Sequence, residues 1–175
     1  MIDEEGWLHT GDIGELSEDG FLRITDRKKD LFKLSTGKYV MPQPLENRLS
    51  AEPLIDQSVV IGSGHKFASA LIFPSEDNIR LLAQSLGISS ALELPALCQN
   101  ERILSEISRI VDKANEGMSH WSTIKRFTVV PAELSVENDL LTPTLKVKRA
   151  EVRNTFSEAI EKLYADEHQY TEDQL

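Results

Sequence analysis

The sequence lacks the features that mark secreted and membrane-spanning proteins. It has one cysteine, Cys98, so no disulfide can form within the chain and a reducing compartment is expected. No stretch approaches the roughly 18 consecutive apolar residues of a membrane-spanning helix. The first five residues, MIDEE, form neither a basic nor an apolar signal segment. We therefore predict a cytoplasmic protein, with peripheral attachment to the inner face of a membrane as the alternative.

Metal-ligand patterns are also missing. His65, His120 and His168 have no metal-ligand spacing with one another or with Cys98. No nucleophile elbow is present either. We predict no resident metal and a structural, buried role for Cys98. Trp7 is expected to pack in a core or against a hairpin.

Positive charge is scarce but unevenly distributed. With 29 acidic and 19 basic residues, the formal net charge is −10, which argues against general nucleic-acid binding. Residues 27–38 nevertheless hold five cations and one anion, and residues 142–149 hold three cations and no anion. These two basic segments could attract a small polyanion such as a nucleotide or CoA. On charge alone, solvated surface lysine is the favoured interpretation.

The hydrophobic pattern predicts an α+β fold, in which an N-terminal β-hairpin precedes a small sheet packed with helices. Apolar, β-branched runs at 55–61 and 68–73 are separated by Gly62-Ser63-Gly64 and should pair as strands. Further strands are predicted at 13–16, 21–24, 31–34, 39–40 and 127–130. Helices are predicted from Pro42, from Ile79, from Ile103 and over 152–163, where apolar residues recur every three or four positions.

Three segments carry a resemblance to a known superfamily. They are Gly6-Trp7-Leu8-His9-Thr10-Gly11-Asp12-Ile13-Gly14; Asp26-Arg27-Lys28-Lys29-Asp30, continuing through Gly37 to Pro42 and Glu46; and Leu141-Thr142-Pro143-Thr144-Leu145-Lys146-Val147-Lys148-Arg149. In this order they resemble the adenylate-forming, AMP-binding enzymes, a superfamily of acyl-CoA synthetases, peptide-synthetase adenylation domains and luciferases. The likeness covers nearly the whole chain and is closest to long-chain fatty acid–CoA ligases.

The resemblance implies a division of the chain. Residues 1–26 would be the end of a large AMP-binding domain running into a hinge. Residues 27–165 would be the C-terminal domain that swivels about that hinge, and residues 166–175 an acidic, disordered tail. Lys29 would be the hinge residue. Asp12 and Arg27 would bind the ribose of ATP, and a carboxylate is a good acceptor for two neighbouring hydroxyl groups.

The third segment is expected to supply the lysine of the adenylation step, which we place at Lys146. A positioned ammonium can stabilise the negative charge that develops on the α-phosphate. The commoner family pattern has glycine before this lysine, whereas this chain has Leu145. Lys148 is therefore a competing candidate. Long-chain members tolerate the departure, so it indicates the subgroup.

For the second step, the resemblance implies that the loop from Lys33 to Tyr39 lines the tunnel for the pantetheine arm of CoA. Gly37 would allow the thiol arm to approach closely, because glycine has no Cβ and accepts positive φ. Lys33 would lie near the adenylate.

The expected reaction converts ATP, a fatty acid and CoA into acyl-CoA, AMP and pyrophosphate, with Mg²⁺ accompanying ATP. Because the phosphate-binding loop and the acyl pocket are not in this sequence, we expect a C-terminal portion that is inactive alone and has the large domain as its partner. Alternatives are an adenylation-domain fragment of a peptide synthetase or other acyl-activating enzyme, and a non-catalytic module that binds a nucleotide, CoA or a protein.

Overall fold

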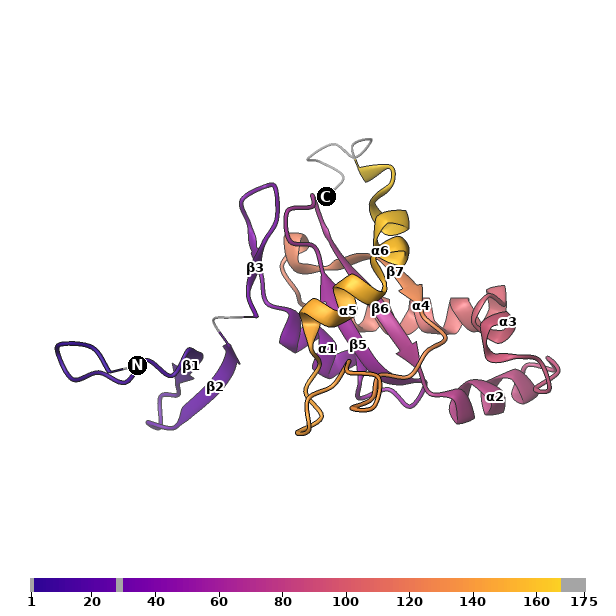
Figure 1. Ribbon diagram of the computed structural model, residues 1–175, viewed down its shortest axis with the longest axis horizontal. Helices are drawn as coiled ribbons and strands as arrows, with labels where there is room; N and C mark the ends of the chain where they lie inside the picture. The colour runs from indigo at the N-terminus through magenta and orange to yellow at the C-terminus, as the bar shows by residue number, and fades with distance from the viewer. Residues whose placement is uncertain (1, 28–29, 168–175) are drawn as a thin grey trace.

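The computed structural model describes residues 2–27 and 30–167, arranged as a β-hairpin beside a body of helices and small sheets (Figure 1). The predicted hinge residue, Lys29, and residues 168–175 of the predicted tail lie outside the described residues. The first two residues of that tail are described. Asp166 pairs with Arg126 at 2.5 Å, and Glu167 contacts His65 at 3.1 Å.

The N-terminal hairpin consists of β1 (Asp12–Leu16) and β2 (Leu22–Arg27), which pair antiparallel. A two-stranded hairpin is marginally stable in water by itself. Large apolar side chains at this end of the chain are exposed: Trp7 is 70% exposed and Phe21 is 76% exposed. Of the two roles expected for Trp7, packing in a core is therefore wrong for this chain. The hairpin projects from one side of the body (Figure 1).

The body is built on a three-stranded sheet in the order β5 (Ile55–Ile61), β6 (Ala68–Pro74) and β7 (Ile124–Val129). The predicted pairing of the first two strands is confirmed and is antiparallel, whereas β6 and β7 run parallel. Every residue of the central strand β6 is buried. A strand covered on both faces reads as a continuous apolar run, which explains why the sequence shows no alternation there.

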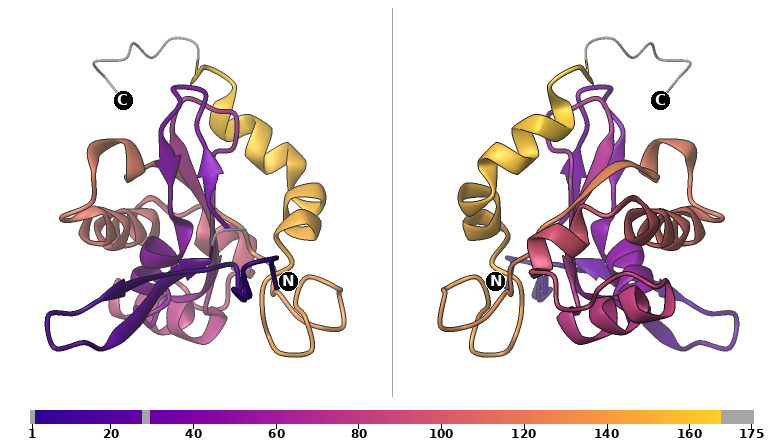
Figure 2. Two further views of the ribbon diagram at one scale, coloured as in Figure 1. Left: turned by 90° about the vertical axis from the view of Figure 1, so that its left-hand side faces the viewer. Right: turned by 90° about the vertical axis from the view of Figure 1, so that its right-hand side faces the viewer.

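Helices cover the two faces of this sheet and create two hydrophobic clusters (Figure 2). Four helices lie on one side, namely α1 (Pro42–Leu49), α2 (Glu76–Ser85), α3 (Leu94–Cys98) and α4 (Glu101–Asn115). Two lie on the other, α5 (Arg149–Thr155) and α6 (Ser157–Tyr164). A short β3–β4 hairpin (Phe32–Lys33 and Tyr39–Val40) and a 3-10 helix (His120–Ser122) complete the body. This arrangement confirms the α+β class.

The last helix differs from its prediction. The stripe over 152–163 predicts one helix, but the chain breaks at Phe156, whose φ of −107° and ψ of 25° are not helical. The Phe156 ring packs edge-on against Phe73, with centroids 5.3 Å apart. Val152 and Leu163, on either side of the break, are both buried in the same cluster. Packing on the sheet has thus overridden a continuous helical pattern.

Cys98 is buried at the end of α3, as predicted. Burial, together with the nearby Glu76 carboxylate, raises the pKa of its thiol to about 11. A thiol with that pKa is almost wholly protonated at neutral pH and is a poor nucleophile. None of the helices within residues 2–27 and 30–167 is long and apolar enough to cross a membrane.

Candidate functional site

The N-terminal hairpin brings together the two residues predicted to bind ribose. Asp12 and Arg27 are direct Cα partners in the β1–β2 ladder, although 15 positions separate them in the sequence. Asp12 is exposed, and its backbone N–H donates to Thr10 Oγ1 at 3.1 Å. The backbone positions of these two residues therefore lie at the same end of the hairpin.

A second hairpin, β3–β4, carries Lys33 and Gly37. Lys33 is the cross-strand partner of Tyr39, and its ammonium lies 5.8 Å from the centre of the tyrosine ring. Gly37 occupies the turn at φ +86°, a conformation that favours glycine. A Cβ built there would have only the Lys33 Cε within 4 Å, at 4.0 Å, so this chain leaves the position open. The geometry agrees with a place where another molecule approaches the backbone.

The third segment folds into a tight hairpin with an exposed tip. Leu141 and Val147 form an antiparallel bridge at its base, and Leu141 is 5% exposed. Thr142 holds the tip together. Its N–H donates to the carbonyl of Lys146 at 2.8 Å, and its Oγ1 accepts from the N–H of Lys146 at 3.0 Å. The backbone at Lys146 is thus fixed from both sides, while its side chain is exposed.

The two candidate lysines of this segment lie in different surroundings. The Lys148 ammonium forms an ion pair with Asp139 Oδ1. Among the residues that the structure describes, none hydrogen-bonds to or pairs with the ammonium of Lys146. A cation that acts on a phosphate must be free to leave any partner it has. The geometry therefore favours Lys146 over Lys148.

An ion-pair network joins the second segment to the third. Both terminal guanidinium nitrogens of Arg149 donate to Glu46, at 2.9 Å to Oε1 and 2.5 Å to Oε2, and Glu46 is 8% exposed. Glu46 Oε1 also accepts the buried N–H of Val60 at 2.7 Å. Arg149 Nε lies 3.7 Å from Asp30, the first described residue after the predicted hinge. The Arg149 guanidinium thus links Asp30 and α1 to the end of the hairpin at residues 141–147, which we call the lysine hairpin.

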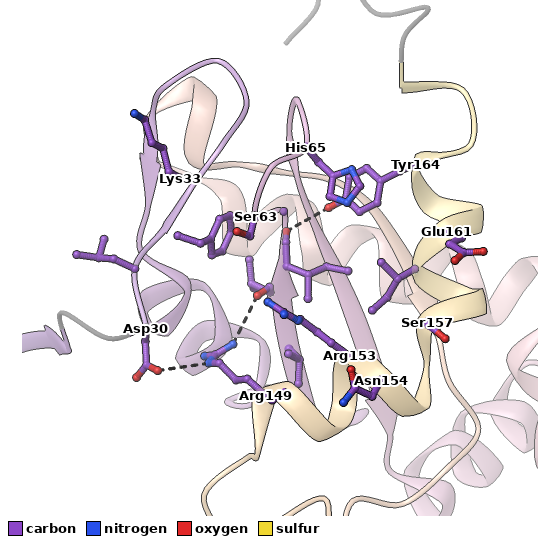
Figure 3. Close-up of a pocket in the computed structure, with 18 of the residues that line it drawn as sticks. Asp30, Lys33, Ser63, His65, Arg149, Arg153, Asn154, Ser157, Glu161 and Tyr164 are labelled. Atoms are coloured by element: carbon purple, nitrogen blue, oxygen red, sulfur yellow. Dashed lines mark hydrogen bonds and ion pairs between the residues drawn. The ribbon is translucent and has the colours of Figure 1, made fainter.

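A half-open groove of about 850 Å³ lies between the β3–β4 hairpin and α5–α6 (Figure 3). The Asp30–Arg149 pair stands at one end, and His65 stacks on Tyr164 at the other, with ring centroids 3.6 Å apart. Lys33 points away from the groove at its rim, whereas Arg153 points into it (Figure 3). Gly37 and Lys146 do not line it.

The predicted site residues are therefore not gathered at one place. The β3–β4 hairpin and the loop that precedes α5 lie at opposite ends of the body (Figure 1). The hairpin with Asp12 and Arg27 projects from the side. A single static pocket cannot include the β1–β2 hairpin, the β3–β4 hairpin and the loop before α5. A domain that turns can present the latter two to the same ligand in succession.

Comparison with protein families gives a match over residues 29–168 to the C-terminal domain of AMP-binding enzymes. The chain belongs to this family. The match confirms the recognition made from the three sequence segments.

Relatives of this AMP-binding C-terminal domain include long-chain fatty acid ligases. The long-chain-fatty-acid–CoA ligase FadD15 of Mycobacterium tuberculosis is 37% identical over 163 residues, which cover 93% of this chain and 27% of that protein. Human long-chain-fatty-acid–CoA ligase 1 is 37% identical over 169 residues, covering 94% of this chain and 24% of that protein. The chain thus spans about a quarter of the length of these relatives.

Solved structures show the same fold. The adenylation domain of a carboxylate reductase from Mycobacterium chelonae superposes with a TM-score of 0.73 and 28% identity, over 94% of this chain and 24% of that one. The corresponding domain from Segniliparus rugosus, solved with AMP and a carboxylic acid, gives a TM-score of 0.73 and 26% identity, again over 94% of this chain and 24% of that one.

Within this AMP-binding C-terminal domain, sequence reasoning assigned no role to Arg149 or to the groove. Glu46 and Arg149 belong to the second and third segments, and 103 positions separate them. The available signal was that each is a charged residue next to an apolar stripe, where an unpaired charge would be costly. The groove gives no local signal, because its lining comes from stretches that are far apart in the sequence, from residue 30 to residue 164.

Proposed function

We propose that this chain is the C-terminal, swivelling part of a fatty acyl-CoA ligase. One observation carries the proposal. Lys146, whose ammonium has no partner among the described residues, lies in the loop that precedes α5, and the glycine turn at Gly37 lies in the β3–β4 hairpin at the opposite end of the body. The 37% identity to long-chain ligases over 93% of the chain supports this subgroup. Two separate surfaces fit an enzyme that performs two different steps.

In the first step, an oxygen of the fatty-acid carboxylate attacks the α-phosphorus of ATP. The bond from that phosphorus to the bridging oxygen breaks, and pyrophosphate leaves with its electron pair. Lys146 would hold the carboxylate and α-phosphate together and stabilise the charge of the transition state. Asp12 and Arg27 would hold the ribose. Mg²⁺ would accompany ATP as part of the substrate and neutralise phosphate charge.

In the second step, the CoA sulfur attacks the carbonyl carbon of the acyl-adenylate, AMP leaves, and the thiol proton is released. The domain would first turn about the hinge at Lys29, so that the β3–β4 hairpin faces the adenylate. Gly37 would then allow the pantetheine arm to pass, with Lys33 beside it. The open space at the Gly37 Cβ position supports this assignment.

The large AMP-binding domain would be the main partner of this chain. The hairpin of residues 2–27 leaves Trp7, Leu16 and Phe21 more than two-thirds exposed. Apolar side chains gathered on so small an element indicate a surface that another unit covers. In this proposal residues 1–26 belong to the large domain, residues 27–165 swivel, and residues 166–175 form a tail. A cytoplasmic location is part of the proposal.

The isolated chain is predicted to bind Mg-ATP only weakly, because the phosphate and adenine contacts would lie on the large domain. Calorimetric titration of the 175-residue chain with Mg-ATP should give no saturable heat at micromolar concentrations. A micromolar dissociation constant, which corresponds to about −8 kcal/mol, would instead support a self-sufficient nucleotide-binding module. The same titration with CoA in place of Mg-ATP tests whether the chain is instead a CoA-binding module.

A further inference from the structure

The residue before Lys146 combines two unfavourable features. Leu145 adopts φ +58°, the left-handed region that costs free energy for a residue with a branched side chain. Its side chain is also 67% exposed. The chain thus accepts a strained backbone and an apolar side chain in water at the same position. Strain of this kind gathers at functional sites, where the observed outlier supports an inference of function.

Nothing within the described residues needs the Leu145 side chain to hold the loop. The N–H of Leu145 donates to the carbonyl of Thr142 at 2.8 Å, a bond that any residue could make. The tip is further held by Thr142, whose hydroxyl also lies 3.0 Å from the Thr144 hydroxyl. The base is anchored by Leu141, which is buried in the same hydrophobic cluster as Val152 and Leu163. Glycine or asparagine at position 145 would adopt the same φ with less strain.

We propose that the Leu145 side chain is a positioning residue that docks the lysine hairpin onto an apolar patch of the large AMP-binding domain during adenylation. The inference rests on the proposed function. Consecutive Cα atoms lie about 3.8 Å apart, so Leu145 must lie inside the domain interface whenever Lys146 reaches the α-phosphate. The fixed backbone then lets one apolar contact set the direction of the lysine. Burying a leucine that is exposed in the free domain favours the docked arrangement.

The occupant of this contact is the large domain and not a second copy of the chain. The hairpin base is rigid and its tip is small, so Leu145 is the one large apolar side chain that the tip at 142–146 offers. A single leucine is too small an area for a stable dimer. It suffices as an anchor within one polypeptide, where the hinge already keeps the two surfaces close.

The test separates the side chain from the backbone strain with four variants of position 145. Leu145→Gly and Leu145→Asn remove the apolar side chain and relieve the strain. Leu145→Ala removes the side chain and keeps the strain, and Leu145→Met keeps both. Thermal unfolding is measured on the 175-residue chain. Fatty-acid-dependent pyrophosphate exchange, and CoA attack on supplied acyl-adenylate, are measured on the complete enzyme.

Thermal unfolding and pyrophosphate exchange should group the four variants differently. The glycine and asparagine variants should melt about 2–4 °C higher than wild type, while the alanine and methionine variants should melt near it. Pyrophosphate exchange should fall about 10-fold in the glycine, asparagine and alanine variants, a loss of about 1.4 kcal/mol, and stay near wild type in the methionine variant. CoA attack should be unchanged in all four.

Two results would overturn this inference. One is wild-type exchange in the glycine, asparagine and alanine variants; the other is an equal loss in both half-reactions. Lys146→Ala, assayed in parallel, distinguishes this failure from failure of the proposed function. If Lys146→Ala abolishes exchange while Leu145→Gly is neutral, only the docking role is lost. If Lys146→Ala is itself neutral, the proposed function fails.

Discussion

Replacing Lys146 by alanine in the complete enzyme should lower fatty-acid-dependent pyrophosphate exchange at least about 100-fold, or about 3 kcal/mol. The ammonium of Lys146 has no partner among the described residues, and its backbone is held at both N–H and carbonyl by Thr142. A cation fixed in this way acts on charge that develops in the transition state, where each positioned donor has its largest effect. CoA attack on supplied acyl-adenylate should survive the substitution.

Lys148→Ala is the matched control for this measurement. It removes the same kind of charge two positions away, but that charge is already paired with the exposed carboxylate of Asp139. Such surface pairs contribute at most about 1 kcal/mol, so exchange should stay within about threefold of wild type. If Lys148→Ala abolishes exchange and Lys146→Ala does not, the assignment of the adenylation lysine must be reversed.

Arg149→Met should destabilise this chain by about 2–4 kcal/mol, measured by urea unfolding. It leaves Glu46, which is 8% exposed, without the guanidinium that contacts both of its oxygens. Removing one partner of a buried pair costs about 3–5 kcal/mol. The expected loss is smaller because the Arg149 side chain is 27% exposed. The Val60 N–H keeps its bond to Glu46 and limits the damage further.

Asp30→Asn provides the comparison for Arg149→Met. Asp30 lies 3.7 Å from the same guanidinium but is 32% exposed. Asp30→Asn should lower the free energy of unfolding by less than about 1 kcal/mol. If Arg149→Met costs no more than Asp30→Asn, the Glu46–Arg149 pair does not stabilise the attachment of the 141–147 hairpin to the body.

Much of the fold could be predicted from local patterns. Pro42 with Leu45 and Leu49 predicts α1, and the apolar runs at 55–61 and 68–73 predict the strand pair, because each signal lies within one element. The break at Phe156 could not be predicted in this way. It depends on where Phe73, far earlier in the chain, places its ring.

The candidate site likewise combines features that local sequence reveals with features that depend on residues far apart in the chain. Its residue types could be read from three short segments, but the choice between Lys146 and Lys148 could not. That choice depends on the pairing of Lys148 with Asp139, itself at φ +63° in a preceding turn. The structure also gives a reason for the family's preference for glycine before the lysine, because position 145 has positive φ.

The central claim is that one domain serves two steps through two different surfaces. The most direct measurement compares both half-reactions in the complete enzyme for Lys146→Ala, Gly37→Leu and Gly37→Ala. Both Gly37 variants carry the same strain at φ +86°, but only leucine would fill the space that the proposal gives to pantetheine.

We expect opposite patterns for the two positions. Gly37→Leu should lower CoA attack about 100-fold, as misplacement of a reacting group by about 1 Å can do, and leave pyrophosphate exchange within about threefold of Gly37→Ala. Lys146→Ala should lower pyrophosphate exchange and leave CoA attack on supplied acyl-adenylate nearly unchanged. If both substitutions lower the same half-reaction, or each lowers both equally, the domain does not present two surfaces in turn and the claim is contradicted.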